Sequence, residues 1–240
     1  MPELPEVETT IRYLTSKVKG KKIISISKSQ KKLRKNLNFK DLESISQRKI
    51  ISVKRFAKYI VIRLDNDNYL IVHLGMSGRL KFYLNENYKK EKHDHVVLQF
   101  DKFKIVFNDP RRFGMFFRLE DIKEVEFFFN NYGTDLLVNK VKIQEIYNKF
   151  ISKKVSLKQA LLNQSLIVGI GNIYANEALF HSRLSPLRLT NSLNLAELTQ
   201  LISSCKFVLK LSLKNGGSSI NDYKSPDGTM GSFQLSLIHI

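Results

Sequence analysis

Residues 59–74, YIVIRLDNDNYLIVHL, decide the fold of the first half of the chain. Two runs of mostly β-branched, aromatic and aliphatic residues flank the tetrapeptide Asp65–Asn68, whose residue types favour a turn. This pattern predicts a β-hairpin. Short runs of the same character follow it: 79–84, 95–100, 103–109 and 115–119. Several short strands at this spacing predict an antiparallel sandwich or barrel.

Helical patterns stand on both sides of this β-rich region. Near the start, four apolar residues spaced by three and four give one helical face: Leu4, Val7, Ile11 and Leu14. After about residue 130, Ser156 is placed to cap a helix and residues 194–213 form a long amphipathic segment. We therefore predict an α+β protein of two domains. The first is an N-terminal β-sandwich with flanking helices at 1–130, and the second is a helical domain at 131–240.

Charge is the strongest bulk property of the chain. It has 40 basic and 22 acidic residues, a formal net charge of +18. The segment 17–35 holds nine basic residues and no acidic one. Such an excess favours a polyanionic partner, with nucleic acid first and an anionic membrane surface second. For segment 17–35 alone, a solvated lysine-rich face explains the pattern equally well.

Cysteine content and apolar runs limit the class of protein. The one cysteine, Cys205, excludes an internal disulfide and a multi-cysteine zinc site, and its place on an apolar helical stripe predicts a core position. The start of the chain is acidic and lacks the apolar segment of a signal peptide. No apolar run approaches the roughly 20 residues that span a bilayer. We expect a soluble, cytoplasmic protein.

Seven segments carry the motifs that point to a function: MPELPEVET (1–9), AKYIVI (57–62), HLGMSGRL (73–80), KHDHVVLQF (92–100), NDPRRFG (108–114), LNQSLIVGIGNIYANEALF (162–180) and GGSSINDYKSPDGTMGSF (216–233). In this order they resemble the bacterial formamidopyrimidine-DNA glycosylase family, over nearly the whole chain. The resemblance implies a helix-two-turn-helix element in the second domain. It also implies excision of oxidised purines, such as 8-oxoguanine and formamidopyrimidines, from damaged double-stranded DNA. A monomer suffices for this chemistry, so we expect a monomer.

The resemblance implies catalytic roles near the N-terminus. Pro2, freed by removal of Met1, forms a Schiff base with the sugar, and an α-amine, whose ordinary pKa is ~8, is partly unprotonated at neutral pH. Glu3 is the general acid, and Lys58 stabilises charge and assists proton transfer. Taken alone, Pro2 also suits a first helical position and Lys58 a surface charge. Glu6 either supports the helix start or only complements the helix dipole.

The family also fills the space that an extruded nucleotide leaves in the duplex. Met76, Arg111 and Phe113 match the residues that do so. Their position in glycine-flanked turns argues against the alternative that Met76 and Phe113 belong to a core. The adjacent Arg112 is expected to contact phosphate at most.

Other matched positions are implied to contact DNA. They are His93, Arg111, Lys153, Asn172 and the nearby Lys158. Asn172 opens a helix, and a helix start with free N–H groups favours a phosphate. The glycine-rich segment 216–233 resembles the loop that closes over the lesion, with four candidate residues: Gly217, Ser218, Ser219 and Tyr223.

A metal is not expected in this chain. Full-length relatives carry one structural zinc in a four-cysteine finger, and the sequence ends in LSLIHI without those cysteines. Natural truncation and a fragment both explain this end. His73, His93 and His95 lack an accompanying carboxylate or cysteine cluster, so they do not favour a metal site, and His73 is expected to be a packing residue.

Three functions are compatible with some of these features. A base-excision-repair glycosylase with AP lyase activity explains all the motifs. A catalytically impaired DNA-binding remnant, caused by the missing finger, shares them and differs only in activity. A basic RNA-binding protein explains the charge but not Pro2, the three gap-filling residues or the lesion loop.

Overall fold

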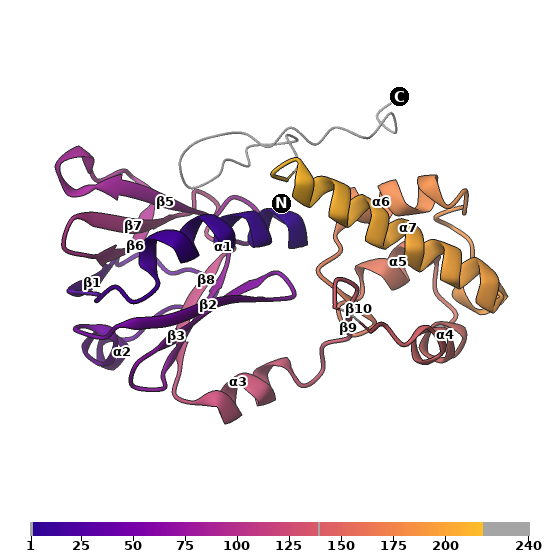
Figure 1. Cartoon of the computed structure of the whole chain (residues 1–240), viewed down its shortest axis with the longest axis horizontal. Coiled ribbons are helices and arrows are strands. Elements are labelled where there is room, and N and C mark those ends of the chain that lie inside the picture. The colour runs from indigo at the N-terminus through magenta and orange to yellow at the C-terminus, as the bar shows by residue number, and fades with distance from the viewer. Residues whose placement is uncertain (1, 139, 218–240) are drawn as a thin grey trace.

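Two four-stranded antiparallel sheets form the first part of the molecule. The computed structural model describes residues 2–138 and 140–217. One sheet has the order β1 (Ser25–Lys28), β6 (Asp94–Gln99), β7 (Phe103–Asn108), β5 (Arg79–Leu84). The other has the order β2 (Ile50–Phe56), β3 (Tyr59–Leu64), β4 (Tyr69–His73), β8 (Met115–Leu119). The predicted strands are thereby confirmed (Figure 1).

The hairpin predicted from residues 59–74 joins β3 to β4. Arg63 pairs with Tyr69, and the Leu64 N–H donates to the Asn68 carbonyl at 2.9 Å. Asp67 has a φ of 60°, the left-handed conformation that aspartate tolerates better than most residues. The turn chemistry therefore sets the register of the hairpin.

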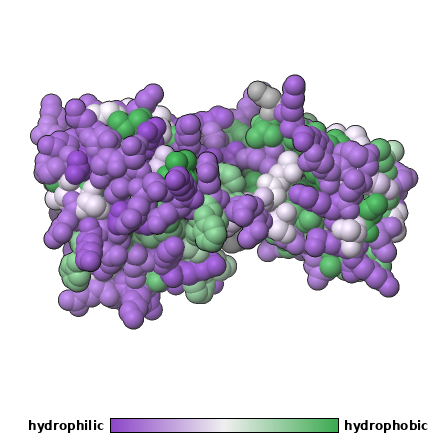
Figure 2. Space-filling view, turned by 90° about the horizontal axis from the view of Figure 1, so that it is seen from below, coloured by the Kyte–Doolittle hydropathy of each residue, from purple (hydrophilic) through white to green (hydrophobic). Residues whose placement is uncertain are grey.

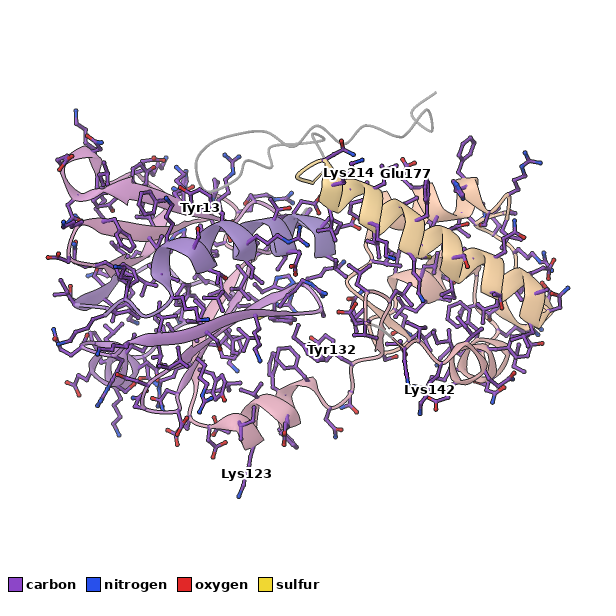
Figure 3. The ribbon with its side chains drawn as sticks, viewed as in Figure 1. Tyr13, Lys123, Tyr132, Lys142, Glu177 and Lys214 are labelled. Carbon is purple, nitrogen blue, oxygen red and sulfur yellow. The ribbon has the colours of Figure 1, made fainter. Side chains whose placement is uncertain are left out.

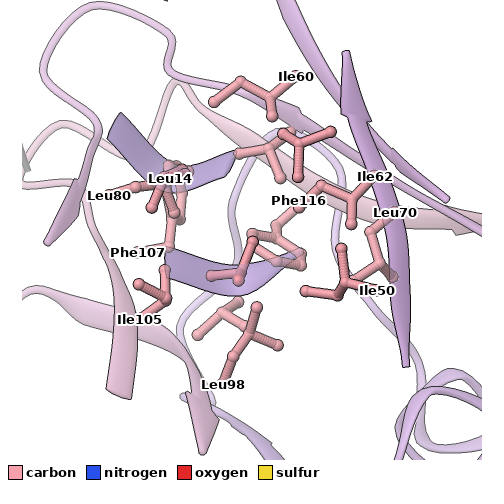
Figure 4. Packing of buried hydrophobic residues seen from close by; sticks show 14 of the residues in the cluster. Leu14, Ile50, Ile60, Ile62, Leu70, Leu80, Leu98, Ile105, Phe107 and Phe116 are labelled. Carbon is pink, nitrogen blue, oxygen red and sulfur yellow. The ribbon is translucent and has the colours of Figure 1, made fainter. Parts of the chain in front are cut away.

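The sandwich core lies between the two sheets and is closed by a helix. Side chains from both sheets meet there, as Figure 4 shows for Leu70, Leu98 and Phe107 among others. Helix α1 (Leu4–Val18) adds the face that its apolar spacing predicts, because Val7, Ile11, Leu14 and Val18 are all buried in this cluster. Helix α2 (Phe39–Ile45) and the short η1 (Asn85–Asn87) complete this half.

The second half is helical. A linker with α3 (Ile122–Phe129) leads into it, and its own elements are β9 (Thr134–Asp135), α4 (Ile143–Ile151), α5 (Leu157–Leu162), β10 (Ile167–Val168), α6 (Asn172–His181), η2 (Thr190–Ser192) and α7 (Leu195–Lys214). The Ser156 side chain caps α5 by accepting from the Gln159 N–H, as predicted. Cys205 is fully buried in the core beneath α7, which confirms the core prediction.

Helix α1 belongs to both halves. Leu4 lies in the core of the helical half, and its N–H donates to the Gly169 carbonyl at 3.0 Å. Gly169 has a φ of 87°, and a Cβ there would lie 2.5 Å from the Leu4 side chain. The sequence pattern assigned this helix to the first domain alone, because apolar spacing shows which face is buried and not against what.

A second connection between the halves lies along the linker that contains α3. The Tyr132 hydroxyl donates to the Tyr59 hydroxyl at 3.0 Å, and Tyr132 is labelled in Figure 3 above the end of α3. The Phe56 ring packs on the Phe129 ring with centroids 4.1 Å apart. Aromatic contacts thus join β2 and β3 to the linker.

Polar residues dominate the face seen from below (Figure 2). Within residues 2–138 and 140–217, no helix has both the length and the apolar character needed to cross a membrane.

Candidate active site

The carboxylate of Glu3 is bound by the first turn of α6. Its Oε2 accepts from the Gly171 N–H at 2.6 Å and its Oε1 from the Ile173 N–H at 2.9 Å. A Cβ on Gly171 would lie 2.5 Å from the Glu3 carboxyl carbon, so only glycine permits this approach. A helix N-terminus is a ready anion site, and here the anion is a side chain of the same molecule.

This contact corrects one expectation about Asn172. Asn172 is the first residue of α6, as predicted, but the amides around it are not free for phosphate because Glu3 occupies them. The sequence pattern located the helix start correctly and could not show that a residue about 170 positions away fills it. The Asn172 side chain is exposed, so its own contact with DNA stays a prediction.

Burial sets the protonation of Glu3. The side chain is 1% exposed, and desolvation raises its pKa to about 7, against the opposing effects of Lys58 and the backbone N–H groups. A carboxyl group with a pKa near neutrality is suited to donate a proton at physiological pH.

Lys58 is brought to the same place by a tight turn. Ala57 and Lys58 connect β2 to β3, and Ala57 has a φ of 51°. Lys58 is only 8% exposed, and burial lowers its pKa while the charges of Glu3 and Glu6 raise it. Lys58 is therefore a buried residue within the electrostatic reach of two buried carboxyl groups, which excludes the alternative that it is a solvated surface charge.

Glu6 holds the peptide group between Pro2 and Glu3. Its Oε2 accepts from the Glu3 N–H at 2.8 Å, and its Oε1 accepts from the Tyr174 hydroxyl at 2.5 Å. Both oxygens are engaged in a fully buried position, which favours a supporting role over a simple helix-dipole carboxylate. Pro2 is buried beside this group. The structure thus buries the three N-terminal residues Pro2, Glu3 and Glu6 together with Lys58 from the β2–β3 turn.

Two exposed loops lie at the end of the sandwich and carry the predicted gap-filling residues. Met76 is 41% exposed and Phe113 is 47% exposed, so neither belongs to a core. Arg111 is also exposed, and its guanidinium lies 5.1 Å from the centre of the Phe113 ring. Gly75, with a φ of 64°, brings the loops together, because a Cβ there would lie 2.6 Å from the Phe113 backbone.

A buried carboxylate locks these two loops. Asp109 is 0% exposed and accepts from the Ser77 hydroxyl at 2.6 Å and from the Gly114 N–H at 2.8 Å. The Arg111 N–H donates in turn to the Ser77 hydroxyl oxygen at 3.1 Å. Sequence reasoning missed Asp109 and Ser77. An aspartate before a proline in a turn was the available indication for Asp109.

The histidines have separate places. His93 precedes β6, and its carbonyl accepts from the Asp109 N–H at 3.0 Å, so it lies next to the loop of Arg111. His73 packs against the Tyr59 ring and its Nδ1 accepts from the Gly75 N–H at 3.0 Å. Burial lowers the pKa of His73 to about 4, as expected for a neutral packing residue.

The remaining predicted residues lie in the helical half or outside the described residues. Lys153 follows α4, and its carbonyl accepts from the Thr190 hydroxyl, while Lys158 lies in the first turn of α5. Gly217 is the last described residue. Three lesion-loop candidates lie outside the described residues: Ser218, Ser219 and Tyr223.

A zinc site does not fit the residues described. No group of three or more histidine, cysteine, aspartate or glutamate side chains there is placed to hold a metal ion. The one cysteine of the sequence is buried in the helical core, so the four-thiolate ligand set of the resembled family has no counterpart in it.

Comparison with known proteins assigns the chain to a family. Residues 1–116 match the formamidopyrimidine-DNA glycosylase N-terminal domain, and residues 132–224 match the formamidopyrimidine-DNA glycosylase H2TH domain. A formamidopyrimidine-DNA glycosylase of Wolbachia sp. subsp. Brugia malayi is 41% identical over 98% of this chain and 87% of its own length. One from Zymomonas mobilis is 41% identical over 97% of this chain and 86% of its own length.

Solved structures agree with this assignment. A variant of the Lactococcus lactis enzyme in complex with Fapy-dG containing DNA has a TM-score of 0.88 at 30% identity, over 95% of this chain and 84% of its own. The Lactococcus lactis protein with abasic-site DNA has a TM-score of 0.87 at 29% identity, over 96% of this chain and 84% of its own. The fold, the buried N-terminal cluster and these matches lead to one conclusion: the chain belongs to the formamidopyrimidine-DNA glycosylase family.

Proposed function

We propose that the chain is a base-excision-repair DNA glycosylase with AP lyase activity, acting on oxidised purines in double-stranded DNA. The observation that carries the proposal is the buried cluster in which the Pro2–Glu3 peptide, the Glu3 carboxyl and Lys58 converge at the start of α6. The relatives bear the glycosylase name, and the similar Lactococcus lactis structures are complexes with lesion-containing or abasic DNA. The net charge of +18 supports a polyanionic substrate.

The chemistry begins at Pro2. After removal of Met1, its secondary amine attacks C1′ of the damaged nucleotide and loses its proton. The base leaves with the electron pair of the C1′–N bond and takes up a proton. Glu3 donates a proton to the sugar ring oxygen, which opens the ring and gives a cationic iminium. The raised pKa of Glu3 supports this assignment, because part of its population is protonated at neutral pH.

The second step cleaves the strand. The iminium withdraws electrons from C2′, so a C2′ proton is lost and the 3′ phosphate leaves by β-elimination. Lys58 faces the carboxyl groups of Glu3 and Glu6, and its burial lowers its pKa, which supports a part in proton transfer. Hydrolysis of the iminium then returns the free amine.

The extruded nucleotide requires a filled gap and held phosphates. Met76, Arg111 and Phe113 are exposed on two loops that Asp109 fixes, which supports their insertion into the duplex. For the phosphates we assign four side chains from both halves: His93, Lys153, Lys158 and Asn172. We assign the lesion loop to residues 216–233 and the site of action to the cytoplasm, where the chain acts as a monomer.

Borohydride trapping tests the proposal. A duplex with one 8-oxoguanine opposite cytosine is incubated with the Met1-free protein, and reduction fixes the iminium as a covalent adduct. We expect an adduct that Pro2→Gly abolishes or greatly weakens. We expect Glu3→Gln to slow adduct formation from the lesion by about 10²-fold or more, since general acid catalysis is removed.

A substrate with a preformed abasic site separates the roles of the two residues. It already presents a sugar without a base, so Glu3→Gln retains an adduct there, whereas Pro2→Gly, which keeps only a primary amine on a less rigid residue, gives a much weaker one. The absence of any adduct from a folded protein at low salt favours the DNA-binding remnant instead.

A further inference from the structure

A continuous chain of buried hydrogen bonds runs from the end of α7 to the peptide group beside Pro2. The Ser212 hydroxyl lies 2.6 Å from the Tyr174 hydroxyl, which donates to Glu6 Oε1 at 2.5 Å. Glu6 Oε2 accepts from the Glu3 N–H at 2.8 Å. Ser212 and Tyr174 are 0% exposed and Glu6 is 1% exposed. Water therefore does not replace any of these partners without a structural change.

The number of protons on each group determines which atom donates in each of these hydrogen bonds. A tyrosine hydroxyl has one proton, and Tyr174 gives it to the Glu6 carboxylate. The proton between Tyr174 and Ser212 must then come from Ser212, so the serine hydroxyl donates to the tyrosine oxygen. Each hydroxyl orients the next one, and hydrogen bonds in such a series strengthen one another.

The series of hydrogen bonds also reaches the start of the segment assigned to the lesion loop. The Gly217 N–H donates to the Ser212 carbonyl at 2.9 Å, so Ser212 contacts Gly217 through its backbone and Tyr174 through its side chain. Gly216 and Gly217 have φ values of 73° and 96°, which glycine adopts without strain. Lys214, the last residue of α7, lies above the N-terminal end of α1 (Figure 3).

We infer that Tyr174 and Ser212 are positioning residues: they hold the Glu6 carboxylate so that it fixes the Pro2–Glu3 peptide group, and they connect this group to Gly217. The inference rests on the proposed function. It assigns a purpose to the hydroxyl groups of two residues that are 0% exposed, one of which, Tyr174, also packs in the core of the helical half.

The physical reason for such a device is the location of Pro2. The nucleophile is next to a chain end, where residues usually fray and side-chain packing alone leaves the backbone free to rotate. A peptide N–H bound to a carboxylate that is itself bound to a hydroxyl has one favoured orientation. The amine of Pro2 is one residue away, so this orientation determines its distance to C1′.

Two hydroxyl deletions test the inference in the Met1-free protein. Tyr174→Phe removes two hydrogen bonds and Ser212→Ala removes one, and both change the side-chain volume little. We expect both to lower the single-turnover rate of 8-oxoguanine excision by between about tenfold and 10²-fold, because a displaced reacting group reacts slowly. We expect the dissociation constant for the lesion duplex to change less than about twofold, since neither side chain reaches the surface. Ser212→Thr, which keeps the hydroxyl, is expected to recover most of the rate.

Tyr147→Phe is the matched control. Its hydroxyl is also in the helical half, but it donates only to the Leu193 carbonyl at 3.3 Å, away from Glu6. Its excision rate should equal that of the unaltered chain. Unchanged excision rates in both Tyr174→Phe and Ser212→Ala overturn the inference. A fall in rate that is matched by an equal loss of DNA affinity also overturns it, as does a fall of the same size in Tyr147→Phe. The unaltered protein tests the proposed function separately. If it excises no 8-oxoguanine, the proposed function is wrong; if it does and the variants match it, only the positioning role is wrong.

Discussion

The gap-filling loops and the N-terminal cluster hold their functional groups in opposite ways. In the loops, Met76 and Phe113 are exposed, and the group that fixes them, Asp109, is buried. At the cluster, the functional carboxyl of Glu3 is itself buried, together with Glu6 that supports it. A loop side chain is therefore free to change without disturbing the fold, whereas a change at the cluster alters reactivity and stability together.

This difference fits the role proposed for each region. A residue that enters a duplex must be accessible before DNA arrives, so its support lies underneath it. The general-acid role proposed for Glu3 needs a raised pKa instead, and desolvation is the main cause of that shift. The proposed roles thus require the functional group to be buried at the N-terminal cluster and exposed at the gap-filling loops.

The pH dependence of stability gives the largest expected effect. The folded state raises the Glu3 pKa from 4.5 to about 7, so between these values it binds more protons than the unfolded state. The free energy of unfolding should therefore fall as the pH rises through this window, by about 3 kcal/mol in total. Urea unfolding at several pH values, compared with Glu3→Gln, measures this contribution.

Because other groups titrate in both proteins, the difference between the two curves isolates Glu3. Parallel curves from pH 4.5 to 7 would contradict the burial of an ionisable Glu3. A difference that grows with pH in the opposite direction would mean that the backbone N–H groups of α6 outweigh desolvation.

Local patterns in the sequence predicted much of the fold. The turn residues at 65–68 and the short runs of β-branched and aromatic residues predicted the antiparallel sheets, and Ser156 marked the start of α5 correctly. These features depend on neighbours within a few residues, where propensity and capping act directly. The place of Leu4 in the core of the helical half depends on its contact with Gly169, which such local patterns cannot predict.

The site divides in the same way. Family motifs indicated Pro2, Glu3 and Lys58 as site residues, which stays a prediction. The Gly171 and Ile173 N–H groups at the start of α6 were expected to be free for a phosphate, yet both donate to Glu3. Tyr174 was not predicted as part of the site. No sequence feature shows whether a tyrosine on a helix only packs its ring in the core or also donates its hydroxyl to a buried carboxylate. Contacts between segments more than a hundred residues apart need the structure.

Gly171→Ala should have an intermediate effect on the free energy of unfolding, because it displaces the Glu3 carboxyl group from α6. Gly171 has a φ of −128°, which alanine adopts, so the added Cβ acts only through its contact with the Glu3 carboxyl carbon, 2.5 Å away. We expect the free energy of unfolding to fall by about 1–3 kcal/mol, as for other overpacked sites, and excision to fall with it. Chemical denaturation and single-turnover excision on the same preparation measure both.

Asn172→Ala is the neighbouring control for stability. Its side chain is exposed at the same helix start, so its unfolding free energy should stay within about 0.5 kcal/mol of the original. Full stability and full excision in Gly171→Ala would show that the Glu3 carboxylate does not need its place on α6.

The smallest effect on stability is expected at the loops, and it tests the comparison most sharply. Phe113→Ala should change the free energy of unfolding by no more than about 0.5 kcal/mol, because about half of the ring already faces solvent. Its excision of 8-oxoguanine should nevertheless fall, since the gap in the duplex is left unfilled. Asp109→Ala, which removes a buried acceptor of two hydrogen bonds, should instead cost about 1.5–3 kcal/mol. If Phe113→Ala destabilises the protein as much as Asp109→Ala does, the ring is part of the fold, and the separation between exposed functional groups and their buried support does not hold in these loops.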